Sequence, residues 1–271
     1  MTAREALREA TATLQRAGVP SPDVDAEWLL AHVLGLRRSE LHAASVDGEL
    51  EEFRALVERR AEREPLAYIL GEWGFRGLTL AVDPRVLIPR PETEIVVERS
   101  LALLEGVEAP VVLDIGVGSG AIALAIADER PDARIVGTDT SRGALEVAKE
   151  NRKRVGVGER VRLVHGDLLA GEVGPFDLVV SNPPYIAPED LEGLEPELQH
   201  EPPEALVGAG RHIVVAKAAL EVLRPNAALV LEVGDDQSCD VSPFLVALGY
   251  QDVRVSADLA GRERILEGRR R

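Results

Sequence analysis

The feature that most constrains the fold is a strand, a glycine-rich turn and a helix in direct succession. Val111–Ile115 is apolar except for Asp114, which is typical of a buried strand. Segment 116–120 carries glycine at every second position, and 121–127 consists only of Ala, Ile and Leu, which indicates a buried helix. This succession opens a nucleotide-binding unit, so we expect an α/β sheet that binds its ligand at the carboxyl edge.

The spacing of these glycines narrows the choice of ligand. It follows G-x-G-x-G, and the dinucleotide fingerprint G-x-G-x-x-G fits it poorly. Glycine lets the backbone approach a ligand closely, and the amino terminus of a helix favours a negative group such as a carboxylate. The predicted ligand contacts in this turn are Gly116, Val117, Gly118, Ser119 and Gly120.

Acidic residues follow the next two predicted strands. Asp139 comes after Arg134–Thr138, about 20 residues beyond the glycine turn, where an acid is placed to bind ribose hydroxyls. Asp167 comes after Val161–His165, near the expected position of an adenine. For each acid alone, a solvated cap is the more common explanation. Their repetition at successive strand ends favours a binding role.

The tetrapeptide Asn182-Pro183-Pro184-Tyr185 follows a further predicted strand, Phe176–Ser181. Its prolines lack a backbone N–H, so the turn presents hydrogen-bond acceptors. We expect the Asn182 side-chain oxygen and the Pro183 carbonyl to hold the two hydrogens of a planar NH2 group, with the Tyr185 ring against its face. A carboxamide or an exocyclic amino group of a base fits this arrangement. The structural alternative is a proline-stiffened turn.

Together these motifs closely resemble the class I methyltransferases that methylate planar nitrogens. Segments 64–71 and 87–94 bring the resemblance closer to the release factor glutamine methyltransferases, the HemK/PrmC family. The resemblance covers essentially the whole chain in order. It implies S-adenosylmethionine as the cofactor, S-adenosylhomocysteine as its product, and the glutamine of the Gly-Gly-Gln motif of peptide chain release factors as the acceptor.

The resemblance also implies roles for single residues. Asn182, Pro183 and Tyr185 are the implied catalytic residues, and Pro184 joins them in binding the substrate amide. Asn182 also contacts the cofactor. The family often has an aromatic residue after the acid of Gly166-Asp167, whereas this chain has Leu168, so adenine is expected to pack on an aliphatic side chain. Arg90 and Glu92 either steady the cofactor or substrate loop or cap a helix.

Three parts are expected along the chain. Residues 1–73 form a helical bundle, which is either a structural cap or, by resemblance, the domain that recognises the protein substrate. Residues 74–91 form a β-hairpin linker with strands at 78–82 and 86–88 and a turn at 83–85. Residues 92–271 form the S-adenosylmethionine-dependent methyltransferase domain, a Rossmann-like, mostly parallel sheet with one antiparallel strand.

Composition bears on the partners. A net charge of −16 over 271 residues speaks against direct binding of nucleic acid, which depends on neutralising phosphates. The single cysteine, Cys239, excludes an internal disulfide and suits a reducing cytoplasm. Neither a signal peptide nor a membrane-spanning run is evident, and no Cys/His cluster has metal-ligand spacing. We therefore expect a cytoplasmic monomer that binds no metal and no membrane.

Other functions remain open at this point. A ribosomal-protein glutamine methyltransferase is a close alternative. An adenine amino-group methyltransferase would share the Asn182–Tyr185 motif, but it needs a basic face and a way to extract the base from its stack. A non-catalytic binding protein with the same fold is the third alternative, since fold does not fix function. Decay of the glycine turn or of the Asn182 loop would indicate it, and both are intact.

Overall fold

A computed structural model describes residues 2–46 and 48–271, and the chain divides into two units, each described here by itself. The first unit is Met1–Glu72 with Glu195–His200, and the second is Trp73–Leu194 with Glu201–Arg271. A short segment from late in the chain therefore belongs to the helical first unit. No helix in the described ranges combines the length and apolar character needed to cross a membrane.

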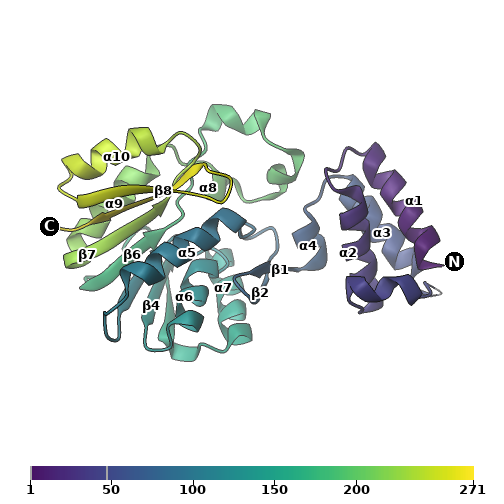
Figure 1. Cartoon of the computed structure of the whole chain (residues 1–271), viewed down its shortest axis with the longest axis horizontal. Coiled ribbons are helices and arrows are strands. Elements are labelled where there is room, and N and C mark those ends of the chain that lie inside the picture. The colour runs from purple at the N-terminus through teal and green to yellow at the C-terminus, as the bar shows by residue number, and fades with distance from the viewer. Residues whose placement is uncertain (1, 47) are drawn as a thin grey trace. The chain divides into compact units, whose positions relative to one another are not determined.

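The first unit is built from helices (Figure 1). Their bounds are α1 Ala3–Arg16, α2 Pro22–Leu34, η1 Arg38–Ala43, α3 Leu50–Ala61, α4 Leu66–Leu70 and η4 Pro196–His200. A capping box begins α1, because Thr2 Oγ1 accepts the Glu5 N–H at 3.3 Å while Glu5 Oε2 accepts the Thr2 N–H at 2.9 Å. Gly35, with φ of 62°, ends α2. The core contains Leu14, Leu29, Leu30 and Phe53.

A charged network ties Glu195–His200 to the helices of this unit. Arg60 is 5% exposed and donates to Asp25 at 2.7 Å and to Glu197 at 2.8 Å. Arg63 donates to the other oxygen of Glu197 at 2.6 Å. Burial alone raises the pKa of Glu197, but the hydrogen bonds from Arg63 and Arg60 outweigh it and lower this pKa to about 2. Glu197 is therefore ionised at neutral pH.

The chain forms a hairpin here, and the predicted strand at 78–82 is observed as β2, but the predicted turn at 83–85 and the return strand at 86–88 are wrong. The two paired strands are β1 Glu72–Phe75 and β2 Leu78–Ala81, so the turn falls at Arg76-Gly77. Both turn residues have positive φ, 45° and 78°, the backbone that a two-residue hairpin turn requires. Segment 86–88 is no strand, because the Ile88 N–H is taken by the carboxylate of Glu201 at 3.0 Å.

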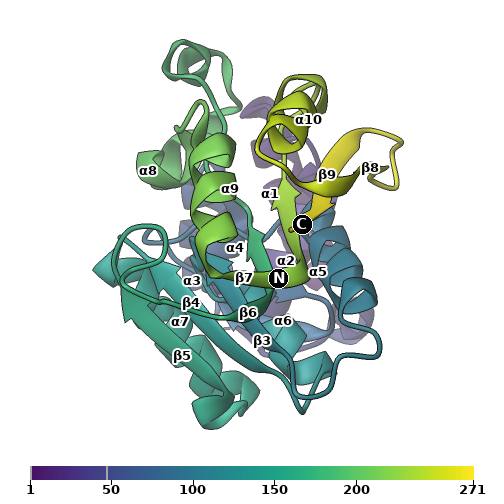
Figure 2. The same ribbon diagram turned by 90° about the vertical axis from the view of Figure 1, so that its left-hand side faces the viewer.

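The second unit holds a seven-stranded sheet in the order β5-β4-β3-β6-β7-β9-β8 (Figure 2). The strands are β3 Val111–Ile115, β4 Arg134–Asp139, β5 Val161–His165, β6 Phe176–Ser181, β7 Leu223–Glu232, β8 Gln251–Ala257 and β9 Glu263–Arg269. Strands β3 to β7 are parallel to one another, and β9 is antiparallel to both β7 and β8. The predicted mostly parallel Rossmann-like sheet with one antiparallel strand is confirmed.

Helices cover both faces of this sheet (Figure 1). The longer ones are α5 Pro91–Leu103, α6 Ala121–Glu129 and α7 Arg142–Val155, whose side chains share one apolar core, and α9 Arg211–Val222 and α10 Ser238–Ala247, which share the other. The short ones are η2 Gly158–Arg160, η3 Pro188–Gly193 and α8 Pro203–Leu206. Strand β3 pairs with β4 on one side and with β6 on the other, so chain order reverses there. Such a reversal opens a crevice at the carboxyl edge.

Candidate functional site

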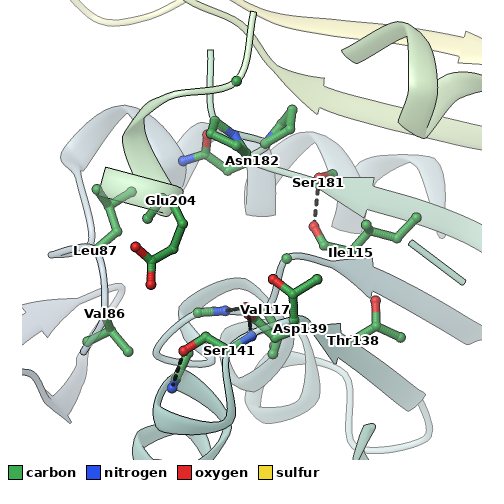
Figure 3. Close-up of a pocket in the computed structure, with 18 of the residues that line it drawn as sticks. Val86, Leu87, Ile115, Val117, Thr138, Asp139, Ser141, Ser181, Asn182 and Glu204 are labelled. Atoms are coloured by element: carbon green, nitrogen blue, oxygen red, sulfur yellow. Dashed lines mark hydrogen bonds between the residues drawn. The ribbon is translucent and has the colours of Figure 1, made fainter. Parts of the chain in front are cut away.

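A cavity of about 400 Å³ lies at this carboxyl edge. Its walls come from the segments that follow four parallel strands, and from the start of α5 and the residues around α8. The strand-end residues in its lining are 116–119, 138–141, 166–168 and 181–184. Figure 3 shows Asn182 and Glu204 on one side of the cavity and Val117, Asp139 and Ser141 on the other. Most of the residues predicted to bind the ligand are therefore brought together.

The glycine turn forms the floor next to β3. Gly116 and Gly118 adopt φ of 78° and 53°, a backbone that side chains with a Cβ rarely take. The N–H groups of Gly116 and Val117 both donate to the Thr138 carbonyl, at 2.8 and 2.9 Å, which fixes the turn on β4. Gly120 begins α6, and an added Cβ there would lie 2.8 Å from Leu124 Cδ1. Helix α6 thus packs closely beneath the turn.

Asp139 sits where β4 meets the cavity. Its Oδ2 accepts the Gly118 N–H at 2.9 Å, and its Oδ1 accepts the Ser141 N–H at 2.8 Å (Figure 3). Burial raises the pKa of Asp139, the two backbone hydrogen bonds oppose this rise, and the charge of Glu204 adds to it. Each carboxylate oxygen can accept more than one hydrogen bond, so both keep acceptor capacity toward the cavity.

The end of β5 supplies Asp167 and Leu168. Asp167 forms an ion pair with Arg211 at the start of α9, and both residues line the cavity. Leu168 has φ of 49°, and the Thr138 hydroxyl donates to its carbonyl at 2.7 Å. The leucine side chain therefore offers an apolar wall where the sequence predicts an adenine.

The Asn182 turn faces the glycine turn from the end of β6. Its base is held by Ser181, whose hydroxyl donates to the Ile115 carbonyl at 2.6 Å, so the ends of β6 and β3 are joined (Figure 3). Within residues 2–46 and 48–271, no protein donor occupies Asn182 Oδ1 or the Pro183 carbonyl. Asn182, Pro183 and Pro184 line the cavity. Two acceptors therefore remain open beside it.

Two of the predicted site residues lie apart from the lining. In the described part of the chain, neither Gly120 nor Tyr185 borders the cavity. The Tyr185 ring stacks on His212 with centroids 6.2 Å apart, and its carbonyl accepts the side-chain amide of Gln237 at 3.0 Å. Burial raises the pKa of Tyr185 to about 12, so its hydroxyl stays protonated.

Thr93, which lines the cavity, and the buried Glu232 support the Asn182 turn, and sequence reasoning missed both. The Thr93 hydroxyl donates to Glu232 Oε2 at 2.7 Å, and Asn182 Nδ2 donates to Thr93 Oγ1 at 3.4 Å. Glu232 is 2% exposed, and burial raises its pKa to about 7. The available signal was an acid within the apolar run 227–233. A charge inside a buried strand usually has a specific partner.

Arg90 and Glu201 form a second support. The two side chains are ion-paired, and Glu201, which is 3% exposed, also accepts the Ile88 N–H. Arg90 lines the cavity and belongs to the segment before α5. The pair therefore joins the segment before α5 to Glu201, the residue that follows segment Glu195–His200. Nothing in the sequence pattern linked these two positions.

Asp114 lies under the glycine turn and is nearly inaccessible. Its Oδ2 accepts the Ala123 N–H at 3.1 Å, while Oδ1 is buried without a partner. Burial raises the pKa of Asp114 to about 7, and the charge of Asp139 adds to this rise. Asp114 thus fixes the first turn of α6 to the end of β3.

Comparison with known proteins gives consistent matches. The family model of the PrmC N-terminal domain matches residues 5–71, and that of the methyltransferase small domain matches residues 97–231. The release factor glutamine methyltransferase of Deinococcus radiodurans is 43% identical over 100% of this chain and 99% of its own length. The enzyme of the same name from Geobacter sulfurreducens is 41% identical over 99% of this chain and 96% of its own.

A solved structure supports the fold. A methyltransferase from Pyrococcus furiosus is 22% identical, with a TM-score of 0.53 over 71% of this chain and 89% of its own. At this identity the likeness concerns the fold alone.

Proposed function

We propose the function of this chain from one premise: it belongs to the family of the release factor glutamine methyltransferases. The proposed reaction transfers a methyl group from S-adenosylmethionine to the side-chain amide nitrogen of the glutamine in the Gly-Gly-Gln motif of peptide chain release factors. The observation that carries it is the pair of open acceptors, Asn182 Oδ1 and the Pro183 carbonyl, beside a cavity floored by a glycine turn.

The cavity suits the proposed cofactor. Its volume of about 400 Å³ is within the range of about 300–1,000 Å³ usual for small-molecule sites. Gly116 and Gly118 permit close approach of the backbone, Asp139 offers oxygens to hydroxyl groups, and Leu168 offers an apolar surface to a planar base. S-adenosylmethionine, when bound, supplies a methyl group activated by its sulfonium sulfur.

The proposed role of Asn182 and Pro183 is to orient the amide. An amide nitrogen is a poor nucleophile because its lone pair is delocalised into the carbonyl. When the two acceptors hold both N–H hydrogens, the plane of the substrate amide is fixed. The lone pair of its nitrogen then faces the cavity. Alignment of this kind is worth up to about 7–11 kcal/mol in ideal intramolecular systems. We assign no general base, since the proton is lost readily once the nitrogen is methylated.

Further assignments complete the proposal. We propose residues 1–73 as the part that recognises the release factor, 74–91 as the linker and 92–271 as the methyltransferase domain. We also propose that the protein works in the cytoplasm as a monomer, without direct contact to nucleic acid. The net charge of −16 supports the proposal that the protein does not contact nucleic acid directly.

The test is methyl transfer from labelled S-adenosylmethionine. The protein is incubated separately with a release factor, with its Gln→Ala variant in the Gly-Gly-Gln motif, with ribosomal protein and with DNA. We expect label only in the unaltered release factor. Transfer to DNA or to ribosomal protein in place of the release factor contradicts the proposal.

A variant tests the role of the acceptors. Asn182→Ala should bind S-adenosylmethionine within about 3-fold of the unaltered protein, while transfer falls at least 100-fold, as expected when an orienting contact is lost. Asn226→Gly is the control, since Asn226 lies within β7 with a φ of 65°, which glycine tolerates, and is not part of the cavity lining. Undiminished transfer by Asn182→Ala rules out the assigned role.

A further inference from the structure

Three side chains form a hydrogen-bonded row that ends at the candidate substrate contact. Glu232 at the end of β7 accepts from the Thr93 hydroxyl at 2.7 Å, and Thr93 in α5 accepts from Asn182 Nδ2 at 3.4 Å. Thr93 is 4% exposed and Glu232 is 2% exposed, so water competes little for these bonds. The row leaves Asn182 Oδ1 as the atom that faces away from Thr93.

We propose that Thr93 and Glu232 are positioning residues that fix which end of the Asn182 side-chain amide faces the substrate. This inference rests on the proposed function, because it concerns how Asn182 Oδ1 is kept available to an amide NH2 group. Neither residue touches the substrate in this scheme, since both act through Asn182.

The number of hydrogen-bond donors in the row decides the orientation of the Asn182 amide. An ionised carboxylate only accepts, so the single hydrogen of the Thr93 hydroxyl is committed to Glu232. The Thr93 oxygen can then only accept from Asn182, which requires the NH2 end of the amide. A reversed amide would place its oxygen against the Thr93 oxygen with no hydrogen between them. The oxygen end is therefore directed to the substrate, as the two acceptors of the proposed function require.

Protonation of Glu232 removes this constraint on the orientation of the Asn182 amide. A protonated Glu232 can itself donate to the Thr93 oxygen, which frees the Thr93 hydrogen for Asn182 Oδ1. Both orientations of the Asn182 side-chain amide then become acceptable. In the reversed orientation, the NH2 group of Asn182 faces the NH2 group of the substrate, and no hydrogen bond forms between them. The row therefore holds the productive orientation only while Glu232 is ionised.

The surroundings of Glu232 place its titration near neutrality. Burial raises its pKa to about 7, the Thr93 hydrogen bond opposes the rise, and the charge of Glu92 adds to it. The charges of Arg264 and Arg90 lower this pKa. Two further titratable groups lie nearby: burial lowers the pKa of His212, whose Nε2 contacts the Glu232 carbonyl, and raises the pKa of Tyr185.

The experiment compares variants at saturating S-adenosylmethionine with a release factor as acceptor. Thr93→Val keeps the shape of the side chain but loses its hydroxyl, and we expect kcat to fall about 10- to 100-fold, the factor typical of a lost hydrogen bond to a charged group. The Kd for S-adenosylmethionine should stay within about 3-fold. Thr93→Ser should restore kcat to within about 3-fold of the unaltered protein.

Glu232→Gln separates positioning from a merely structural role. Its carbonyl can still accept from Thr93 but cannot titrate, so the fall in kcat expected for the unaltered protein between pH 8 and pH 6 should disappear. Ser100→Ala is the matched control, because Ser100 is a fully buried hydroxyl on the same helix that donates to the Val96 carbonyl, away from Asn182. Its kcat and pH profile should match those of the unaltered protein.

The outcomes distinguish this inference from the proposed function. If Asn182→Ala abolishes transfer while Thr93→Val keeps full kcat, or while Glu232→Gln keeps the original pH profile, the positioning role is wrong and the proposed function stands. If the Asn182→Ala variant transfers the methyl group at the rate of the unaltered protein, the role of Asn182 in the proposed function is wrong. Loss of kcat in Thr93→Val with rescue by Thr93→Ser supports the inference.

Discussion

Asp139 Oδ2 accepts the backbone N–H of Gly118 at 2.9 Å, so a carboxylate at the end of β4 holds the glycine turn that follows β3. The same carboxylate accepts the Ser141 N–H before α7. One side chain thus fixes two backbone segments of the cavity and still presents acceptor capacity to a ligand. Its loss should affect ligand binding more than folding.

Asp139→Asn tests this relationship. The amide retains one acceptor but turns an NH2 group toward one of the two backbone N–H groups, so the turn loses a hydrogen bond. We expect the Kd for S-adenosylmethionine to rise about 10-fold or more, as for a lost charge-assisted hydrogen bond. Isothermal titration calorimetry measures it, with the exposed Asp128→Asn on α6 as the control. Equal Kd values for the two variants would show that Asp139 is dispensable.

Glu204 adds a second negative charge near the cavity. Its carboxylate points into the cavity, and its charge raises the pKa of Asp139 (Figure 3). S-adenosylmethionine carries one more positive charge than S-adenosylhomocysteine, so Glu204 should favour the cofactor over its product. In Glu204→Gln we expect the ratio of the two affinities to fall about 2- to 5-fold, because Glu204 is exposed and solvent weakens the effect.

The measurement is competitive titration of both ligands against the two proteins. Glu189→Gln, an exposed acid in η3 that is not in the cavity lining, serves as the control. An unchanged ratio in Glu204→Gln would exclude an electrostatic role for this carboxylate.

Leu168 is the expected packing surface for adenine. Because an aromatic ring adds about 0.5–1.5 kcal/mol when it stacks, Leu168→Phe should bind S-adenosylmethionine about 2- to 10-fold more tightly, and Leu168→Ala more weakly. Calorimetry gives the three Kd values, and the unfolding temperature without ligand checks that each variant is folded. Three equal Kd values would place the adenine elsewhere.

Glu197 should stabilise the helical first unit in a pH-dependent way. Its pKa of about 2 in the folded protein is below the ordinary value of about 4.3. The stabilisation is therefore complete above the ordinary value and is lost as the pH falls toward 2. Glu197→Gln should lower the free energy of opening of α3 by about 1–3 kcal/mol at pH 7.

Hydrogen exchange of the α3 amides follows this local stability. The difference between Glu197→Gln and the unaltered protein should shrink as the pH is lowered from 4.5 to 3, and Glu195→Gln should show little effect. A difference that is constant with pH would assign the stability to something other than the ion pairs with Arg60 and Arg63.

The sequence by itself determined the parts of this protein that depend on neighbours along the chain. The parallel strands with helices between them and the glycine turn follow from local spacing, and both are confirmed. The Asn182 turn was recognised in the same way, because a short motif at a strand end carries its chemistry in adjacent residues.

Only the tertiary structure decided which remote residues contact those motifs and where the hairpin turn falls. Thr93 and Glu232 are 139 positions apart and meet because β7 pairs with β6 and α5 packs beside them. The hairpin turn was misplaced because Asp83-Pro84-Arg85 is as typical of a turn as Arg76-Gly77, and the pairing of β1 with β2 decided between them. Spacing along a chain reports which residues are neighbours within one element, whereas contacts between remote elements depend on the order of the strands.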